Sequence, residues 1–179
     1  PMIQLIRMRS IFLVGFMGAG KSSVGRVLAD RLDRPFVELD EVLSRRFGAT
    51  IAEVFDRHGE AAFRAAEREE LLLASQQQGT IVSTGGGAFC DPENRLLIDQ
   101  ADGVSVFLDV PWPVLSERLA SDDGVRPLYH SPEQAKALLD SRLPSYRQAT
   151  LVLAIDADEP PARTAERLAV ALEEVACAT

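Results

Sequence analysis

The amino-acid sequence predicts a three-layer α/β/α fold, in which a five-stranded parallel sheet lies between two layers of helices. Short apolar runs alternate along the chain with segments whose apolar residues recur at helical spacing. These runs are continuous rather than alternating, which is typical of strands buried on both faces of a parallel sheet. A glycine-rich turn of phosphate-binding type follows the first run, and the repeated strand–helix order indicates a doubly wound sheet.

Five apolar runs are the predicted strands, and polar or glycine-containing segments separate them. The strands are Ile11–Val14, Phe36–Leu39, Thr80–Ser83, Val104–Leu108 and Leu151–Ile155. In a sheet of this kind, ligands bind beyond the carboxyl ends of the strands. The residues that directly follow each strand are therefore the first candidates for a functional site.

Helix signals occupy the gaps between these strands. The segment Thr50–Glu53 is a capping box, Gly59 is expected to end the helix that starts there, and a further helix covers Glu60–Ser75. Asp91-Pro92 and Ser131-Pro132 each combine an N-cap residue with proline at the first helical position. The remaining signals are the helix entry Pro111-Trp112-Pro113 and the amphipathic segment Leu168–Val175.

Length, charge and cysteine content limit the classes of protein to consider. The 179 residues suit one compact domain spanning 1–179. A net charge of −8 argues against nucleic acid or an anionic membrane as partner, so an anionic ligand must be held by a local cluster of cations. Two cysteines, Cys90 and Cys177, cannot form a disulfide framework and predict a cytoplasmic protein.

The segment Gly15–Ser22 (GFMGAGKS) fits the phosphate-binding loop pattern G-x-x-x-x-G-K-[ST]. It lies between an apolar strand and a helical pattern, as this loop requires. The glycines leave backbone N–H groups free for phosphate oxygens, and the helix N-terminus adds partial positive charge. Lys21 can reach the β- and γ-phosphates, and the Ser22 hydroxyl can ligate Mg²⁺. The alternative, a glycine-rich turn beside a surface lysine, is disfavoured by these flanking elements.

Glu38 and Asp40 form a second candidate group. Two residues apart in a predicted strand, they should share one face, with α-carbons about 6.5 Å apart. One carboxylate can hold Mg²⁺ through its water shell, while the other accepts a hydrogen bond from a substrate hydroxyl. The alternative is a solvated strand end.

Two further patterns are weak evidence for function when each is taken alone. Arg64 and Glu67 stand three residues apart on one helix face and can pair, although such a pair is most often a surface feature. The run Thr84–Gly87 contains three glycines and lets a ligand approach the main chain, or else forms a plain loop.

Taken in order, these segments resemble the shikimate kinase family, within the nucleoside-monophosphate-kinase-like group of phosphate-loop kinases. The resemblance covers nearly the whole chain. Its motifs are GFMGAGKS at 15–22, FVELD at 36–40, GEAAFRAAE at 59–67, the glycine run at 85–87, Arg126-Pro127-Leu128 in a lid, and RLPSYR at 142–147.

The resemblance implies a fold of the phosphate-loop NTPase type with a mobile lid at about residues 121–131. It implies an enzyme that transfers the γ-phosphoryl group of ATP to the 3-hydroxyl of shikimate, giving shikimate 3-phosphate and ADP in aromatic amino-acid biosynthesis. Mg²⁺ is the expected cofactor, and shikimate and ATP are the expected partners of a cytoplasmic monomer.

The roles of individual residues follow from the same resemblance. Asp40 hydrogen-bonds the reacting hydroxyl, Arg126 closes on the ATP phosphates, and both join Lys21 as catalytic residues. The residues expected to bind ATP are Gly18, Ala19, Gly20, Lys21, Ser22, Ser23 and Arg126. The residues expected to bind shikimate are Asp40, Arg64, the Gly86 backbone and Arg142, and those expected to hold the metal are Ser22 and, through water, Glu38.

The chain departs from the family pattern at Glu38, where family members usually have aspartate. The acidic segment 156–160 lies in the region that closes over adenine in the family, so the adenine contacts stay unassigned, with Arg118 as a candidate. Two alternatives remain open. One is a related kinase of another polyhydroxy acid such as gluconate, and the other is a catalytically weak sensor domain of the same fold.

Overall fold

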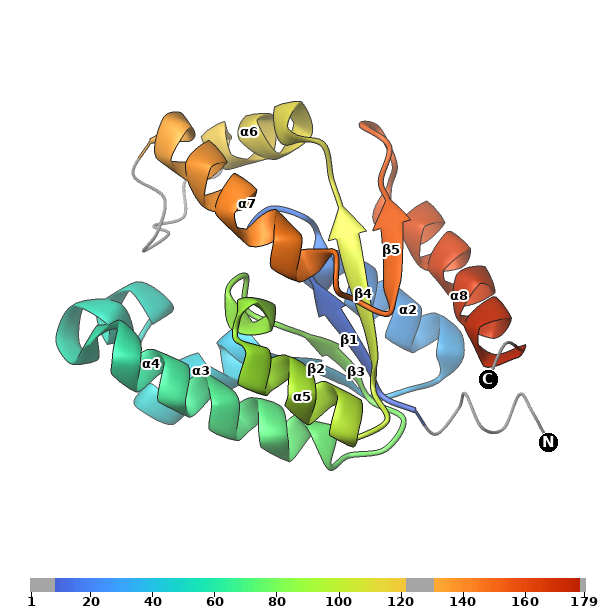
Figure 1. Ribbon diagram of the computed structural model, residues 1–179, viewed down its shortest axis with the longest axis horizontal. Coiled ribbons are helices and arrows are strands. Elements are labelled where there is room, and N and C mark those ends of the chain that lie inside the picture. Colours follow the sequence, from blue (N-terminus) through green and yellow to red (C-terminus); the bar gives the residue numbers. More distant parts are fainter. Residues whose placement is uncertain (1–8, 122–130, 178–179) are drawn as a thin grey trace.

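The computed structural model describes residues 9–121 and 131–177. Five strands form one parallel sheet in the order β2-β3-β1-β4-β5, so that β1 lies at its centre (Figure 1). The strands are β1 (Ile11–Val14), β2 (Phe36–Glu38), β3 (Ile81–Ser83), β4 (Val104–Asp109) and β5 (Leu151–Ala154). The predicted strands and their parallel arrangement are confirmed to within one residue at each end.

Helices cover both faces of this sheet. In Figure 1, α2 and α8 lie against one face, whereas α5 and α7 lie on the other. The helices are α2 (Lys21–Leu32), α3 (Leu39–Phe47), α4 (Ile51–Ser75), α5 (Pro92–Gln100), α6 (Trp112–Ala120), α7 (Pro132–Tyr146) and α8 (Pro161–Cys177), with the 3₁₀ turn η1 (Ala88–Cys90). This confirms the α/β fold class.

The central strands supply the core. All four side chains of β1 are fully buried, which explains why its sequence is apolar without alternation. A second, smaller cluster lies between α3 and α4 and includes Leu43, Val54 and Phe63. This cluster fixes α4 to α3 at the edge of the sheet where the residues after β2 emerge.

The structure corrects the predicted end of the second strand. Glu38 is the last residue of β2, where it pairs with Ser83 of β3, and the chain then turns directly into α3. Asp40 therefore lies in the first turn of a helix and does not share a strand face with Glu38. Beyond Ser83 the neighbouring strand offers no further ladder partner, and the acidic residues Asp40 and Glu41 suit the positive end of the helix dipole.

The predicted helix signals are confirmed, with one refinement. Thr50 and Glu53 form the reciprocal capping box, and the side chains of Asp91 and Ser131 each accept a hydrogen bond at the start of their helix. Gly59 has φ 77° and ψ 168°, so helical geometry breaks there as predicted. The chain resumes its helix at once, so that α4 is a single kinked element with no intervening loop.

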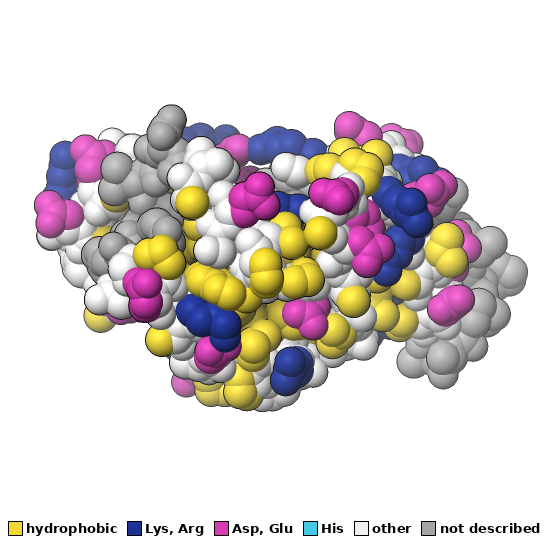
Figure 2. All heavy atoms as spheres, turned by 90° about the horizontal axis from the view of Figure 1, so that it is seen from above, with side chains coloured by type: hydrophobic (Ala, Val, Ile, Leu, Met, Phe, Trp, Pro, Cys, Tyr) yellow, Lys and Arg dark blue, Asp and Glu magenta, His cyan; other side chains and the backbone are white. Residues whose placement is uncertain are grey.

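The surface shows a mixed distribution of charge. On the face seen in Figure 2, Lys and Arg side chains lie among Asp and Glu side chains, with apolar side chains between them. In the part of the chain that is described, no helix has both the length and the apolarity that a membrane span requires. The single-domain assignment over 1–179 stays a prediction.

Candidate active site

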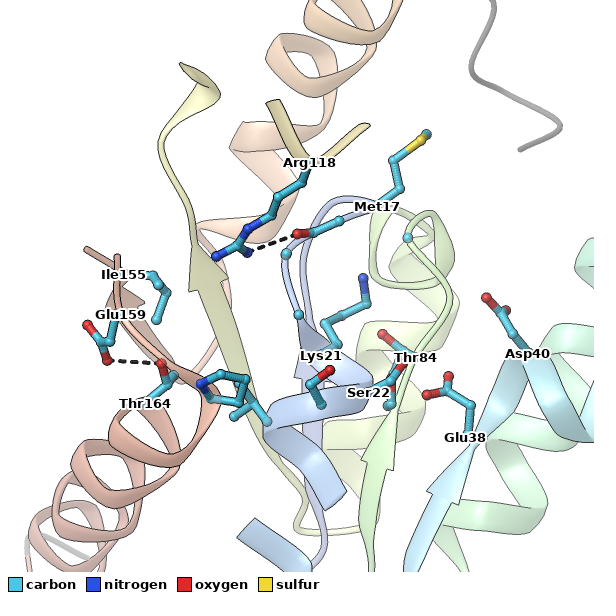
Figure 3. A pocket seen from close by; sticks show the side chains of 18 of the residues that line it. Met17, Lys21, Ser22, Glu38, Asp40, Thr84, Arg118, Ile155, Glu159 and Thr164 are labelled. Carbon is cyan, nitrogen blue, oxygen red and sulfur yellow. Dashed lines mark hydrogen bonds between the residues drawn. The ribbon is translucent and has the colours of Figure 1, made fainter. Parts of the chain in front are cut away.

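A cavity of about 640 Å³ opens at the carboxyl ends of β1, β2 and β3, where the sequence predicts a ligand site. Figure 3 shows Lys21 near its middle, with Glu38 and Asp40 on one side and Ile155, Glu159 and Thr164 on the other. The phosphate loop lines the cavity through Met17, Gly18, Ala19, Gly20, Lys21, Ser22 and Ser23. The expected ATP-binding residues in the described chain therefore lie together.

Three glycines of this loop, Gly15, Gly18 and Gly20, have positive φ, which favours glycine over other residues. Gly20 caps α2 with φ 88° and ψ 18°, a left-handed conformation that turns the chain from loop into helix. Gly15 has φ 144°, and a Cβ there would lie 3.2 Å from the carbonyl oxygen of Leu108. The loop is thus shaped around the helix N-terminus, where backbone N–H groups and the helix dipole favour phosphate.

The Lys21 ammonium holds the loop in this shape. Its Nζ donates hydrogen bonds of 2.9 Å to both the Gly15 and Phe16 carbonyl oxygens, and the residue is only 9% exposed. The positive charge of Lys21 consequently lies within the loop, where backbone N–H groups would surround the phosphate oxygens. The sequence predicts a lysine directed at ligand, and the structure adds a second role in ordering the loop.

Glu38 lies at the floor of the cavity, near Ser22 and Ser83. Its Oε2 is buried and has no hydrogen-bond partner among the described residues. Burial raises the pKa of Glu38, an effect that hydrogen bonds from Ser22 and Ser83 partly offset. Glu38 is therefore buried, unlike a solvated strand end, whereas Asp40 is exposed, and the role of the pair stays a prediction.

Asp40 reaches the same cavity from the first turn of α3. Strand periodicity predicts that Glu38 and Asp40 lie on one face of a strand. In the structure both line the cavity for a different reason, because the chain changes from strand to helix between them. In Figure 3 both carboxylates lie on the same side of Lys21, with Glu38 nearer to Ser22 than Asp40 is.

Arg64 and Glu67 form a largely buried pair, in contrast to the surface pair considered from sequence. Arg64 donates to Glu67 Oε2 at 2.7 Å, and the Glu67 side chain is fully buried. Burial raises the pKa of Glu67, while the Arg64 charge opposes that change. Arg64 also lies against the glycine run, since a Cβ on Gly87 would come within 2.6 Å of its guanidinium.

Arg142 approaches the glycine run from α7. It is 9% exposed, and its guanidinium lies over the Phe16 ring at 6.0 Å from the centroid. A Cβ built on Gly86 would lie 3.7 Å from an Arg142 nitrogen, and Gly86 itself lines the cavity. Arg64 and Arg142 are not among the cavity-lining residues, but Arg142 adjoins Gly86, which lines the cavity, and Arg64 adjoins the next residue, Gly87.

At the opposite end of the cavity, the sequence suggested a role only for Arg118, as a candidate for the adenine contacts. Ile155, Pro161 and Thr164 line that end, and Arg118 donates to the Gly18 carbonyl at 3.1 Å. The buried Glu159 carboxylate accepts hydrogen bonds from Thr164 and Arg167. The acidic segment that contains Glu159 was visible in the sequence, but its burial was not.

Arg126, the third expected catalytic residue, lies outside the described residues, as does most of the expected lid. Ser121, which precedes that segment, lines the cavity. The roles assigned to Arg126 and to the lid accordingly stay predictions.

Comparison with known proteins identifies the family to which this site belongs. A family model described as shikimate kinase matches residues 17–173. The chain belongs to the shikimate kinase family. This confirms the family and the kinase class that the ordered motifs predicted.

Individual members of the family resemble the chain over most of its length. It is 43% identical over 157 residues to a shikimate kinase of Synechococcus sp. (strain CC9605), covering 86% of this chain and 78% of the relative. A shikimate kinase of Stenotrophomonas maltophilia (strain K279a) is 44% identical over 142 residues, covering 78% of each chain. A solved shikimate kinase from Acinetobacter baumannii, in complex with shikimate, matches with a TM-score of 0.84 and 33% identity, covering 97% of this chain and 98% of that one.

Proposed function

We propose that the protein transfers the γ-phosphoryl group of ATP to the 3-hydroxyl of shikimate, giving shikimate 3-phosphate and ADP. The observation that carries the proposal is that the phosphate loop and Asp40 line one cavity. A phosphate donor and a hydroxyl acceptor can therefore meet in one enclosed volume, as phosphoryl transfer requires. The complex of the A. baumannii family member with shikimate supports the choice of acceptor.

The phosphate half of the cavity acts by electrostatics. The transferred phosphoryl group passes through a loose transition state with charge on its outer oxygens, so most of the catalysis comes from alignment and charge stabilisation. Lys21, already held within the loop, supplies a positive charge that needs little reorganisation. Arg126 is proposed to add a second positive charge by closing on the ATP phosphates.

The acceptor half binds a hydroxylated carboxylic acid. Asp40 orients the reacting hydroxyl and takes up its proton late in the transfer. Arg64 and Arg142 grip the planar carboxylate, which a guanidinium fork can do bidentately. The Gly86 backbone closes the wall between these arginines and the phosphate loop. The two arginines and the glycine run favour shikimate over gluconate.

Ser22 and Glu38 are the residues that would hold Mg²⁺. The donor set fits, because the Ser22 hydroxyl lies at the phosphate loop and the buried Glu38 Oε2 has no hydrogen-bond partner within the described chain. When bound, Mg²⁺ neutralises charge on the β- and γ-phosphate oxygens. Glu38 would act on its water shell, a role that suits a buried carboxylate that lines the cavity with Ser22.

The adenine base is assigned to the opposite end of the cavity. Ile155 and Pro161 offer apolar surface there, and the Arg118 guanidinium is fixed to the loop through Gly18. A flat aromatic base can pack on apolar side chains and stack on a guanidinium. This orientation directs the γ-phosphate toward Glu38 and Asp40.

A titration separates the proposed function from its alternatives. ADP release is followed while shikimate or gluconate is added, each with and without MgATP. Shikimate-dependent ADP release supports the proposal, and gluconate-dependent release would show a related kinase. Binding of shikimate without ADP release would show a sensor domain. The further expectations of a cytoplasmic monomer that contacts neither nucleic acid nor membrane stay predictions.

A further inference from the structure

The last residue of α7, Tyr146, is fully buried although it carries a hydroxyl group. Its ring stacks on Phe107 of β4, with centroids 5.1 Å apart and an angle of 26° between the planes. This packing fixes the direction of the phenol. A buried tyrosine hydroxyl needs a hydrogen-bond partner, and the identity of that partner shows what the side chain does.

The Tyr146 hydroxyl donates to the Gly86 carbonyl oxygen, and a hydrogen bond with the Arg142 side chain also acts on it. Burial raises the pKa of Tyr146, so the hydroxyl keeps its proton and remains a donor at neutral pH. Gly86 lies between three parts of the site. A Cβ built on it would be 3.5 Å from the Met17 amide nitrogen and 3.7 Å from both Gly15 and Arg142.

The other two glycines of the run are held differently. The Gly85 carbonyl accepts from the Ala88 amide at 3.1 Å, and the Gly87 carbonyl accepts from the Cys90 amide at 3.0 Å. Both bonds belong to the local turn. The Gly86 carbonyl instead accepts from a side chain 60 residues away in the sequence. Glycine peptide units rotate at low steric cost, so the orientation of this one depends on Tyr146.

Arg142 and Tyr146 lie one helical turn apart at the same end of α7. The same turn thus carries both the guanidinium beside Gly86 and the hydroxyl that holds the Gly86 carbonyl. We propose that Tyr146 is a positioning residue for shikimate, which keeps the Gly86 carbonyl turned toward α7 and the rest of that peptide available to the cavity. The proposal rests on the proposed function, in which the Gly86 backbone contacts shikimate.

The test is the variant Tyr146→Phe, which keeps the ring on Phe107 and removes only the hydroxyl. The expected result is a rise of about tenfold in the KM for shikimate, since the freed carbonyl can turn into the cavity, while the KM for ATP stays within about twofold. The matched control is Ser105→Ala. Ser105 is 2% exposed and accepts from the Thr150 amide at 2.9 Å, at the opposite end of the sheet. It should lose stability with both KM values unchanged.

A second measurement, hydrogen exchange of the wild type and of Tyr146→Phe, needs no substrate. In the wild-type protein, the Ala88 and Cys90 amides, which donate to the Gly85 and Gly87 carbonyl oxygens, should be protected from deuterium exchange, and in Tyr146→Phe they should exchange faster. Rapid exchange in the wild type would overturn the proposal. So would a Tyr146→Phe variant that loses stability but keeps its KM for shikimate, or one in which both KM values rise equally. Absence of shikimate-dependent ADP release by the wild type would instead refute the proposed function.

Discussion

Gly85 lies directly against the buried carboxylate of Glu67. A Cβ at position 85 would overlap Glu67 Oε1, an atom that is buried without a hydrogen-bond partner among the described residues. The glycine run and the kinked helix α4 therefore fit together only because position 85 has no side chain. Through the Arg64–Glu67 pair, this contact also determines where the Arg64 guanidinium lies.

Gly85→Ala is expected to destabilise the protein by about 1–3 kcal/mol, because the new methyl group displaces a buried carboxylate that cannot move into water. Gly86→Ala is the matched comparison, since its methyl group would meet nothing closer than 3.5 Å. Urea denaturation of both variants measures the difference. Equal loss of stability in the two variants would mean that the contact with Glu67 does not determine the cost.

Lys21→Met should lower kcat by about 10²-fold or more, through lost charge stabilisation in the transition state. It should also lower stability by about 1–3 kcal/mol, because two loop carbonyl oxygens lose their donor. The control is Lys136→Met, since Lys136 pairs with Asp140 on the surface of α7. A kcat close to wild type in Lys21→Met would refute the phosphate-loop assignment.

Glu38→Gln should raise the Mg²⁺ concentration needed for half-maximal activity and reduce kcat, because the amide is a weaker partner for the metal's water shell. Glu38→Asp should be mild or even improve activity. Activity is titrated against Mg²⁺, with Glu41→Gln as control, since Glu41 is an exposed neighbour paired with Arg26. An unchanged Mg²⁺ dependence in Glu38→Gln would exclude Glu38 from the metal site.

Loss of Arg142 or Arg64 should weaken shikimate binding by about 2–4 kcal/mol and barely change the affinity for ATP. Arg142→Lys should recover only part of the loss, because an ammonium keeps the charge but not the fork. An analogue with an amide in place of the carboxylate provides the critical measurement. Wild type and the control Arg147→Ala should discriminate strongly against it, and Arg142→Ala much less. Equal discrimination would show that Arg142 does not contact the carboxylate.

The stability of the protein should depend on pH through Glu159. Burial alone would raise the pKa of Glu159, but hydrogen bonds from Arg167, Thr164 and the Asp156 amide lower it below its usual value. The folded state then binds this proton less tightly than the unfolded state. The resulting stability is present above the unfolded-state pKa of about 4.3 and is lost as the pH falls through the lower folded-state value.

The measurement is the urea midpoint of wild type and Glu159→Gln between neutral and acidic pH. The advantage of the wild type should be largest near neutral pH and shrink on acidification. Glu173→Gln, at an exposed position on α8, is the control. A difference between wild type and Glu159→Gln that is independent of pH would contradict the assignment.

The succession of strands and helices along the chain, the phosphate loop and the family could all be predicted from the amino-acid sequence. These features depend on contiguous residues: the apolar run of β1, the spacing from Gly15 to Ser22, and the cap from Thr50 to Glu53. Periodicity and capping are local effects, so a pattern of neighbouring residues is sufficient to predict them. The same local reasoning failed at Asp40, because the end of β2 depends on where its partner strand β3 stops.

Which polar groups are buried, and what they contact, depends on how distant parts of the chain pack together. Neither the full burial of Glu67 nor the bond from Tyr146 to Gly86 follows from spacing, since each depends on elements packed from distant parts of the chain. Burial changes the energy of such groups far more than their sequence context does, because a polar atom removed from water must find its partner within the protein. The sequence therefore predicts the residues of the site, whereas tertiary packing determines which buried groups position them.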